Sequence, residues 1–377
     1  MNTVPKSQRL TLALVGRTNV GKSTLLNLIA GQDVAITSPI AGTTTDVVEK
    51  AMELLPFGPI LLLDTAGFDD STVLGSERVK KTRKALERAD IVIAVSDAET
   101  DPELSAYSGA LGKPVLFINT RRFSPDDRET FLNFFIPALL PMVPAEFVQP
   151  PPLFSDIVPK HATIFQIVPI DSQAPKGRII LPQMNVLREA LDNDFVSVVT
   201  TEKNIPQTLA GLTNPPHLTV CDSQVVHIMC RDVPEPLPVT TYSIIMARCK
   251  GDLATFIAGA KAIDSLKDGD KILIAESCTH HAGDEDIGRV KIPKWIQKRT
   301  GKQLVFECVA GRDFPETLAG YALVIQCGGC MTNRAQILSR IATARAAGIP
   351  ITNYGVCISF LQDVLDRVIR PFGNQGI

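Results

Sequence analysis

The sequence lacks a long hydrophobic run and an excess of charge of either sign. No apolar run approaches the ~18 uninterrupted residues that a membrane-spanning helix requires. Lysines and arginines number 38 against 40 aspartates and glutamates, and no basic patch is evident, so we expect no nucleic-acid partner. Residues 1–10 contain no long apolar core and no cleavage signal. We therefore predict a cytoplasmic protein without a membrane partner.

The eight cysteines do not have the regular spacing of a disulfide framework. A reducing compartment would keep such scattered residues as thiols. Three of them, Cys278, Cys327 and Cys330, stand in two short motifs with metal-binding character. The others lie in apolar surroundings, and we interpret most of them as small core residues: Cys221, Cys230, Cys249, Cys308 and Cys357.

A glycine-rich loop near the amino terminus is the first motif with a chemical meaning. Residues 9–15 predict a buried strand and residues 24–30 a helix, and residues 16–23 between them read Gly-Arg-Thr-Asn-Val-Gly-Lys-Ser. This is the P-loop pattern in its strand–loop–helix context: glycines let backbone N–H groups cradle phosphates, Lys22 neutralises the β- and γ-phosphates, and Ser23 offers its hydroxyl to Mg²⁺. The predicted nucleotide-binding residues of this loop are Asn19, Val20, Gly21, Lys22, Ser23 and Thr24.

Two further motifs follow in the order that a nucleotide hydrolase needs. Residues 42–46 read Gly-Thr-Thr-Thr-Asp and suit a switch loop, in which Thr44 would order around a γ-phosphate and its metal. After the apolar strand 60–63 comes Asp64-Thr-Ala-Gly67, where Asp64 would hold Mg²⁺ through water and the Gly67 amide would sense the γ-phosphate. The predicted magnesium site is Ser23, Thr44 and Asp64, and the predicted catalytic residues are Lys22, Thr44 and Gly67.

These motifs together resemble a translation-factor-related small GTPase domain, in the branch where an apolar residue, here Phe68, replaces the catalytic glutamine. The resemblance implies GTP and Mg²⁺ as cofactors. It also implies a potassium ion beside the phosphates, held partly by Asn19, and two G domains that face each other. The activity that it implies is slow GTP hydrolysis stimulated by K⁺.

The base-binding end departs from the GTPase pattern. The strand 114–118 should lead into Asn-Lys-x-Asp, whose aspartate accepts two hydrogen bonds from guanine, but here the sequence is Asn119-Thr-Arg-Arg122. Asn119 remains a predicted nucleotide ligand, whereas the carboxylate would have to come from Asp126 or Asp127 in the next loop. No convincing Ser-Ala-Lys motif follows. Weak guanine selectivity, or tolerance of another base, is therefore open.

The cysteine motifs each follow a strand-like run, Cys278 after residues 271–275 and Cys327-Gly-Gly-Cys330 after residues 323–325. Helix-like sequence follows both, which places three sulfurs at the carboxyl edge of a parallel sheet. Thiolates are the usual ligands of iron–sulfur clusters and zinc, and both centres need four ligands. The fourth would come from a nearby side chain or from water, and the candidate side chains are His280, His281 and Glu285.

Two other interpretations of these thiols stay open. A structural zinc ion would leave a stand-alone GTPase. Alternatively, Cys327 and Cys330 form a redox pair in an interaction protein whose G domain is a relic. Metal analysis separates both from an iron–sulfur centre.

Prolines mark two expected linkers in a chain of 377 residues, which is too long for one ordinary core. Residues 131–159 are rich in proline, which breaks helices and stiffens connections, and residues 234–238 form a second proline run.

Strands alternating with helices predict parallel sheets covered on both faces. Beyond residue 160 the expected strands are 163–170, 195–200, 218–221, 272–275, 303–308, 323–325 and 349–351, and the expected helices are 181–191, 205–212, 253–266, 287–300, 332–347 and 360–368.

Nearly the whole chain resembles the [FeFe]-hydrogenase maturation GTPases. The resemblance rests on the G domain with Asn19 and Phe68, on residues 169–182 (PIDSQAPKGRIILP), and on Cys-x-His followed far downstream by Cys-x-x-Cys. It implies a homodimeric scaffold that binds a [4Fe-4S] cluster through Cys278, Cys327 and Cys330, with His280 and Glu285 as candidate fourth ligands. It also implies that the scaffold receives a di-iron precursor from radical-SAM maturation enzymes and delivers it to apo-[FeFe]-hydrogenase.

The expected fold class is α/β with three domains. These are a P-loop G domain over residues 1–158, a small α/β dimerisation domain over 159–236, and a parallel-sheet α/β iron–sulfur cluster domain over 237–377. At residue 326 a glutamine stands where the family often has a histidine, so the fourth cluster ligand falls to another residue or to an exogenous group.

Overall fold

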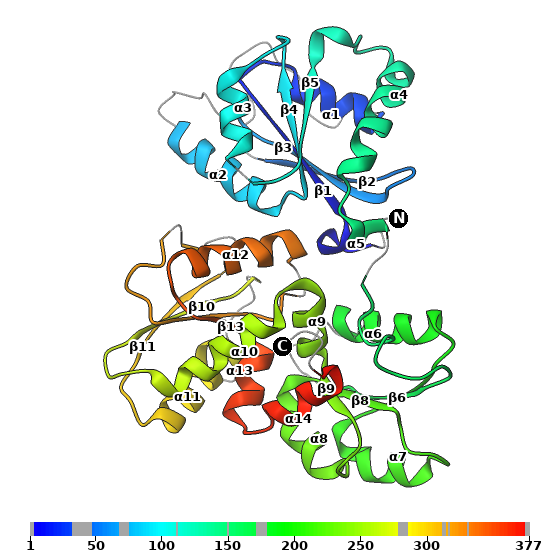
Figure 1. Ribbon diagram of the computed structural model, residues 1–377, viewed down its shortest axis with the longest axis vertical. Helices are drawn as coiled ribbons and strands as arrows, with labels where there is room; N and C mark the ends of the chain where they lie inside the picture. The colour runs from blue at the N-terminus through cyan, green and yellow to red at the C-terminus, as the bar shows by residue number, and fades with distance from the viewer. Residues whose placement is uncertain are drawn as a thin grey trace. The chain divides into compact units, whose positions relative to one another are not determined.

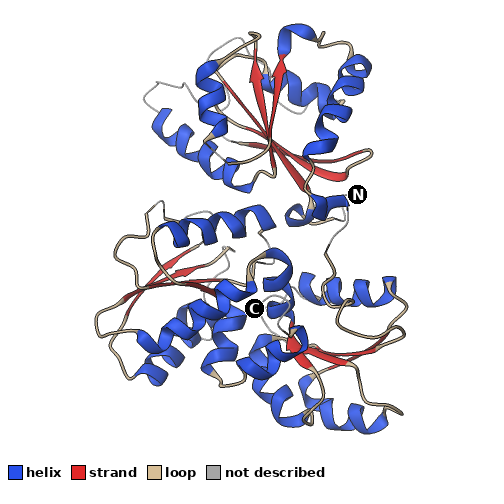
Figure 2. Cartoon of the chain, in the orientation of Figure 1, coloured by secondary structure: helices blue, strands red, loops and turns tan. Residues whose placement is uncertain are grey.

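The computed structural model describes residues 4–31, 47–67, 75–110, 112–148, 151–170, 179–277, 286–310, 314–315, 317–329 and 332–373. The chain divides into two compact units, Met1–Pro150 and Pro151–Ile377, and each combines parallel strands with covering helices (Figures 1 and 2). The α/β fold class is therefore confirmed. Among the described residues, no helix has the length and apolar character needed to cross a membrane.

The first unit is built on one five-stranded sheet of order β2-β3-β1-β4-β5, in which only β2 is antiparallel to its neighbour. Helices cover both faces, and the central strands are almost fully buried, which explains their continuous apolar sequence. The strands are β1 (Leu10–Gly16), β2 (Val48–Leu54), β3 (Gly58–Asp64), β4 (Ile91–Ser96) and β5 (Val115–Asn119), and the helices are α1 (Lys22–Ala30), α2 (Gly75–Arg88), α3 (Pro102–Gly109), α4 (Arg128–Leu139) and α5 (Ala145–Val148).

Helix α4 corrects the expectation that prolines interrupt helical structure from residue 131 onward. The helix runs through Pro137 and ends only at Leu139. Phe131, Phe135 and Leu139 recur at a spacing of four and are fully buried in the core that α4 shares with α1. Burial of two aromatic rings and a leucine on one stripe offsets the backbone hydrogen bond that Pro137 removes.

The second unit contains two four-stranded parallel sheets, of order β7-β6-β8-β9 and β11-β10-β12-β13. The expected strands and most expected helices of this region are confirmed, with β8 at the predicted bounds. The strands are β6 (Thr163–Ile167), β7 (Val196–Thr200), β8 (Leu218–Cys221), β9 (Val239–Thr241), β10 (Lys271–Ala275), β11 (Val305–Val309), β12 (Leu323–Gln326) and β13 (Ile351–Asn353). The helices are α6 (Leu181–Asp192), α7 (Ile205–Gly211), α8 (Val226–Asp232), α9 (Tyr242–Lys250), α10 (Leu253–Lys261), α11 (Ile292–Thr300), α12 (Arg334–Ala346), α13 (Tyr354–Leu361) and α14 (Leu365–Ile369), with a π-helical turn at Ile287–Lys291 before α11.

Two local features differ from the expected elements. The predicted helix over 360–368 is instead divided between α13 and α14, because Asp363 has a φ of 57°, a left-handed conformation that ends a helix. The proline run at 234–238 does not end the β7-β6-β8-β9 sheet of the second unit, because β9 follows the run and pairs with β8. The sheet therefore extends past residue 236.

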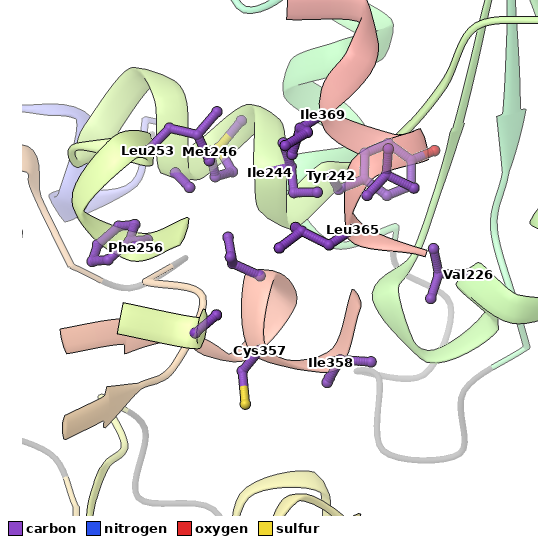
Figure 3. Packing of buried hydrophobic residues seen from close by; sticks show 14 of the residues in the cluster. Val226, Tyr242, Ile244, Met246, Leu253, Phe256, Cys357, Ile358, Leu365 and Ile369 are labelled. Carbon is purple, nitrogen blue, oxygen red and sulfur yellow. The ribbon is translucent and has the colours of Figure 1, made fainter. Parts of the chain in front are cut away.

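One continuous apolar core joins the two sheets of the second unit. Figure 3 shows side chains from α8, α9, α10, α13 and α14 packed together, including Tyr242, Phe256, Cys357 and Leu365. Cys357 is fully buried, as is Cys221, which confirms these two as core residues. Cys308 is an exception to that expectation, since it is exposed on the edge strand β11.

Candidate functional site

The P-loop joins β1 to α1 through a tight backbone path. Gly16 lies against β4, where a Cβ atom would come within 2.2 Å of the Val95 carbonyl oxygen. Asn19 and Gly21 have φ values of 62° and 97°, and Gly21 caps the start of α1. Lys22 Nζ donates to the carbonyl oxygens of Gly16, at 3.1 Å, and Arg17, at 2.6 Å. The lysine therefore closes the loop on itself and holds its charge at the loop's centre.

Ser23 and Asp64 meet at the carboxyl ends of β1 and β3. Ser23 Oγ donates to Asp64 Oδ2 at 2.6 Å, while the other oxygen, Oδ1, is buried without a hydrogen-bond partner among the described residues. Burial raises the pKa of Asp64, although the Ser23 hydrogen bond and the charge of Lys22 act in the opposite direction. A hard divalent cation prefers oxygen ligands and would satisfy the orphaned carboxylate oxygen. The residues present thus fit Mg²⁺.

The base end of the G domain is organised by residues that the sequence alone did not single out. Thr120 Oγ1 donates to the carbonyl oxygens of Val20 and Ser96, both at 3.2 Å, and so ties the turn after β5 to the P-loop. Asn119 Nδ2 donates to Glu99 Oε1 at 3.1 Å, and Arg122 forms an ion pair with the same carboxylate. Arg122 occupies the position at which the GTPase pattern has its aspartate.

Neither aspartate of the following loop is shown at the base end. Asp127 is the N-cap of α4 and accepts from the Thr130 backbone N–H at 3.1 Å. Glu99 is therefore the carboxylate that the described structure places against Asn119. A cavity of about 500 Å³ lies beside it, lined by side chains from β4, β5 and the start of α3. The signal that could have found Glu99 is its place just after the apolar run of β4, at the carboxyl edge of the sheet.

Several predicted site residues lie outside the described residues, and no geometry follows for them. In the first unit these are Thr44 and Phe68, and in the second they are Cys278, His280, His281, Glu285 and Cys330. The described residues contain no group of three or more His, Cys, Asp or Glu side chains that could hold a metal ion.

The two strands that precede the cysteine motifs, β10 and β12, end at the same edge of their sheet. β10 and β12 are neighbours, with Ala275 in register with Gln326. Cys327 N donates to the Ala275 carbonyl oxygen at 2.9 Å, and the Ser277 backbone N–H donates to Cys327 Sγ at 3.2 Å. Ser277 directly precedes Cys278 in the chain. The prediction that both strands end at the same carboxyl edge is confirmed.

Buried polar groups surround this edge. Glu276, which is 3% exposed, accepts from Arg289 Nε and Nη2 at 3.1 and 3.0 Å and from the Tyr354 hydroxyl at 3.4 Å. Burial, followed by the charge of Glu276, raises the pKa of Tyr354. Gln326 Oε1 and Thr332 Oγ1 are buried and have no hydrogen-bond partner within the described ranges. The described part of this edge therefore supplies one thiol, that of Cys327, and sulfur is the ligand type that a soft metal prefers.

Three family models match the chain. Residues 254–371 match the hydrogen maturase F tetramerization domain, residues 153–251 match the hydrogen maturase F dimerization domain, and residues 11–121 match the 50S ribosome-binding GTPase. The first two models together span most of the second unit. The third spans the P-loop, Asp64 and the turn after β5.

Curated relatives match part of the chain. The tRNA modification GTPase MnmE of Zymomonas mobilis is 43% identical over 95 residues, which are 25% of this chain and 22% of the relative. The GTPase Era of Aquifex aeolicus is 33% identical over 174 residues, 43% of this chain and 50% of the relative. The chain spans only about a fifth to a half of the length of these two relatives. Among solved structures, an Aquifex aeolicus Era variant bound to GDP·AlF4⁻ aligns with a TM-score of 0.26 at 20% identity, covering 81% of this chain and 96% of that one.

Proposed function

Because the chain belongs to the hydrogenase maturase F family, we propose that it is a GTP-hydrolysing [4Fe-4S] scaffold of the cytoplasm that carries a di-iron precursor to apo-[FeFe]-hydrogenase. The observation that carries the scaffold part is the contact between Cys327 Sγ and Ser277, the residue before Cys278. This contact supports the proposal because Cys278, the next residue in the chain, is 49 positions from Cys327 in sequence. Cys278, Cys327 and Cys330 would hold the cluster, and His280 and Glu285 stay candidates for the fourth position.

The nucleotide part rests on the pair of Ser23 and Asp64. Ser23 Oγ and Asp64 would hold Mg²⁺, and Lys22 would neutralise the phosphates from the centre of the loop. Thr44 and Gly67 would contact the γ-phosphate. Asn19 would hold K⁺ in place of a water-orienting glutamine. We propose that hydrolysis is slow and potassium-stimulated, and that it regulates partner exchange with the radical-SAM maturation enzymes and the hydrogenase.

The middle domain is proposed as the homodimer interface. Its sheet has one open edge, β7, on which Val196 and Val199 are 56% and 49% exposed, whereas all of β9 at the other edge is buried. An edge strand has unpaired backbone groups, and exposed valines on both of its faces favour pairing with a second strand.

We place the G domain over residues 1–158 and the cluster domain at the end of the chain. Since β9 pairs with β8, the boundary between the last two domains is better placed after α9 than at 236.

The decisive experiment is anaerobic iron and sulfide analysis, with EPR of the reduced protein, on wild type, Cys278→Ala and Cys327→Ala. Four irons per chain, and a cubane signal lost in both variants, are the expected results. Cys357→Ala is the matched control, because that thiol is fully buried in the apolar core and should leave the iron content unchanged. Zinc, or a reversible Cys327–Cys330 disulfide without metal, would overturn the scaffold and leave the nucleotide domain as the chemistry to explain.

A further inference from the structure

The sulfur of Cys327 lies at one end of a line of polar contacts that starts at a buried arginine. Ser277 Oγ is 3.1 Å from Cys327 Sγ, and the backbone N–H of Ser277 donates to the same sulfur at 3.2 Å. Arg340 of α12 donates from Nη1 to Ser277 Oγ over a long 3.5 Å. The Arg340 guanidinium on α12 thus contacts the Ser277 hydroxyl after β10, and this hydroxyl contacts the Cys327 sulfur after β12.

Arg340 is held in place by its surroundings. The residue is only 5% exposed, and its guanidinium stacks over the ring of Phe314 with 5.0 Å between the guanidinium carbon and the ring centroid. Arginine stays charged at all physiological pH values and presents only donors. Because Arg340 is buried and its contact with Ser277 is half-buried, the field of this charge is less screened than it would be at the surface.

Ser277 can donate to a metal-bound sulfur while it accepts from Arg340. A serine hydroxyl carries one proton and two acceptor lone pairs, so Ser277 Oγ accepts from Arg340 and keeps its own proton to donate. A thiolate at Cys327 accepts that proton as well as the backbone N–H of Ser277. A thiol would instead direct its own proton at the hydroxyl. A cysteine bound to a metal carries no proton, so at a bound cluster the Ser277 hydroxyl and the Ser277 backbone N–H would both donate to Cys327 Sγ.

We propose that Ser277 and Arg340 are positioning residues that stabilise the reduced state of an iron–sulfur cluster bound at Cys327, with Arg340 acting through the Ser277 hydroxyl. This inference rests on the proposed scaffold function. Reduction adds negative charge that is partly carried by the cysteine sulfurs, and hydrogen bonds to those sulfurs raise the reduction potential. Removing the hydroxyl or the cation that polarises it should therefore make the cluster harder to reduce.

The test is an EPR-monitored redox titration of the full chain with its cluster, with iron and sulfide measured in every sample. We expect Ser277→Ala and Arg340→Met to keep their iron and to lower the equilibrium constant for reduction about tenfold, which is about 59 mV for one electron. Arg340→Lys keeps the charge and should stay closer to wild type than Arg340→Met. The double variant should show the same shift as either single variant, because both substitutions break one chain.

Two matched controls lie in the same domain. Ser265 is exposed in the turn after α10, and Arg345 is on α12 with a side chain that is 70% exposed. Ser265→Ala and Arg345→Met should therefore leave the reduction potential unchanged.

An unchanged reduction potential in Ser277→Ala with full iron content would overturn the inference but not the proposed scaffold function. Additive shifts in the double variant would show that Arg340 does not act through the hydroxyl. A wild-type protein without iron would overturn the inference and the scaffold together. If Arg340→Met fails to fold, Ser277→Ala and Arg340→Lys decide the question.

Discussion

Ser23 Oγ and Asp64 Oδ2 are 2.6 Å apart, which links the first residues of α1 to the end of β3. The hydrogen bond leaves the second carboxylate oxygen of Asp64 buried and without a partner among the described residues. A buried, half-satisfied carboxylate is costly unless a cation completes it. This pair therefore offers the oxygen ligands with which the nucleotide site would hold a metal ion.

Removing either member of this pair should abolish Mg²⁺-dependent hydrolysis. We expect Ser23→Ala and Asp64→Asn each to lower kcat for GTP by at least about 100-fold, because the metal neutralises charge on the transferred phosphoryl group. Steady-state phosphate release with a Mg²⁺ titration is the measurement. Asp268→Asn, an exposed carboxylate in the second unit, is the control and should behave as wild type. Activity that survives in Asp64→Asn would place the metal elsewhere.

The contacts of Asn119 and Arg122 with Glu99, where the nucleotide base is expected to bind, predict weak discrimination between purine nucleotides. Arg122 stands at the position of the missing aspartate and is paired with Glu99, so the position that would accept from the guanine edge carries a cation instead of a carboxylate. We expect GTP, ITP and XTP to bind within about tenfold of one another, since each lost hydrogen bond to a charged group is worth about 1.5–3 kcal/mol. Competition with a fluorescent GTP analogue measures the ratios.

A paired substitution sharpens the base test. Arg122→Asp restores the carboxylate of the GTPase pattern, and Glu99→Gln in the same variant removes the negative charge that would repel it. This double variant should prefer GTP over XTP by about tenfold more than wild type does. Arg121→Asp with Asp97→Asn changes the neighbouring ion pair and is the matched control. Strong guanine preference in wild type would show that another carboxylate already reads the base.

The sequence predicted most strands because they are buried on both faces and read as short apolar runs. β8, β10 and β12 are nearly or wholly buried, and their predicted ranges agree with the structure to within about one residue. β2 was missed because it is an edge strand with charged residues, Glu49, Lys50 and Glu53, and with little burial. Such a strand has no apolar signal of its own and is fixed by pairing with β3.

The site residues divide in the same way. Lys22, Ser23 and Asp64 belong to local motifs whose spacing carries the chemistry, so they could be found from sequence. Glu99 has a weaker signal, its place just after the apolar run of β4, but its pairing with Arg122, 23 positions away, is not visible in the sequence. Arg340 has no local signal, because its partner Ser277 is 63 positions away. Contacts of this kind exist only once the sheets have brought separate loops to one edge.

The exposed edge strand β7 predicts that a charged substitution on it would dissociate the proposed dimer. Val199→Glu on β7 should weaken the dimer of the middle domain, since it places a charge on an exposed apolar strand at the proposed interface. Val305→Glu on β11, where the valine is 51% exposed, is the matched substitution in the last domain and should leave that dimer intact. Analytical ultracentrifugation over a concentration series is the measurement. Equal dissociation in both variants would contradict an interface on β7.

Asp90 predicts a pH dependence of stability in the first unit. Burial raises the pKa of Asp90 to about 7, despite a backbone hydrogen bond from Thr11 at 2.7 Å that acts in the opposite direction. The unfolded chain has the ordinary value of 3.8, so between pH 4 and 7 the folded state holds a proton that the unfolded state has released. The contribution of Asp90 to the free energy of unfolding is therefore largest below pH 4, and it falls by at most about 4 kcal/mol as the pH rises to 7.

The measurement is denaturant unfolding of the full chain at several pH values in that range, followed by a probe in the first unit. The free energy of unfolding should decline with pH in wild type and change less in Asp90→Asn. Asp97→Asn, an exposed carboxylate after β4, should keep the wild-type slope. Identical slopes in wild type and Asp90→Asn would mean that Asp90 is ionised in the folded state at pH 5 and that its burial is compensated by other groups.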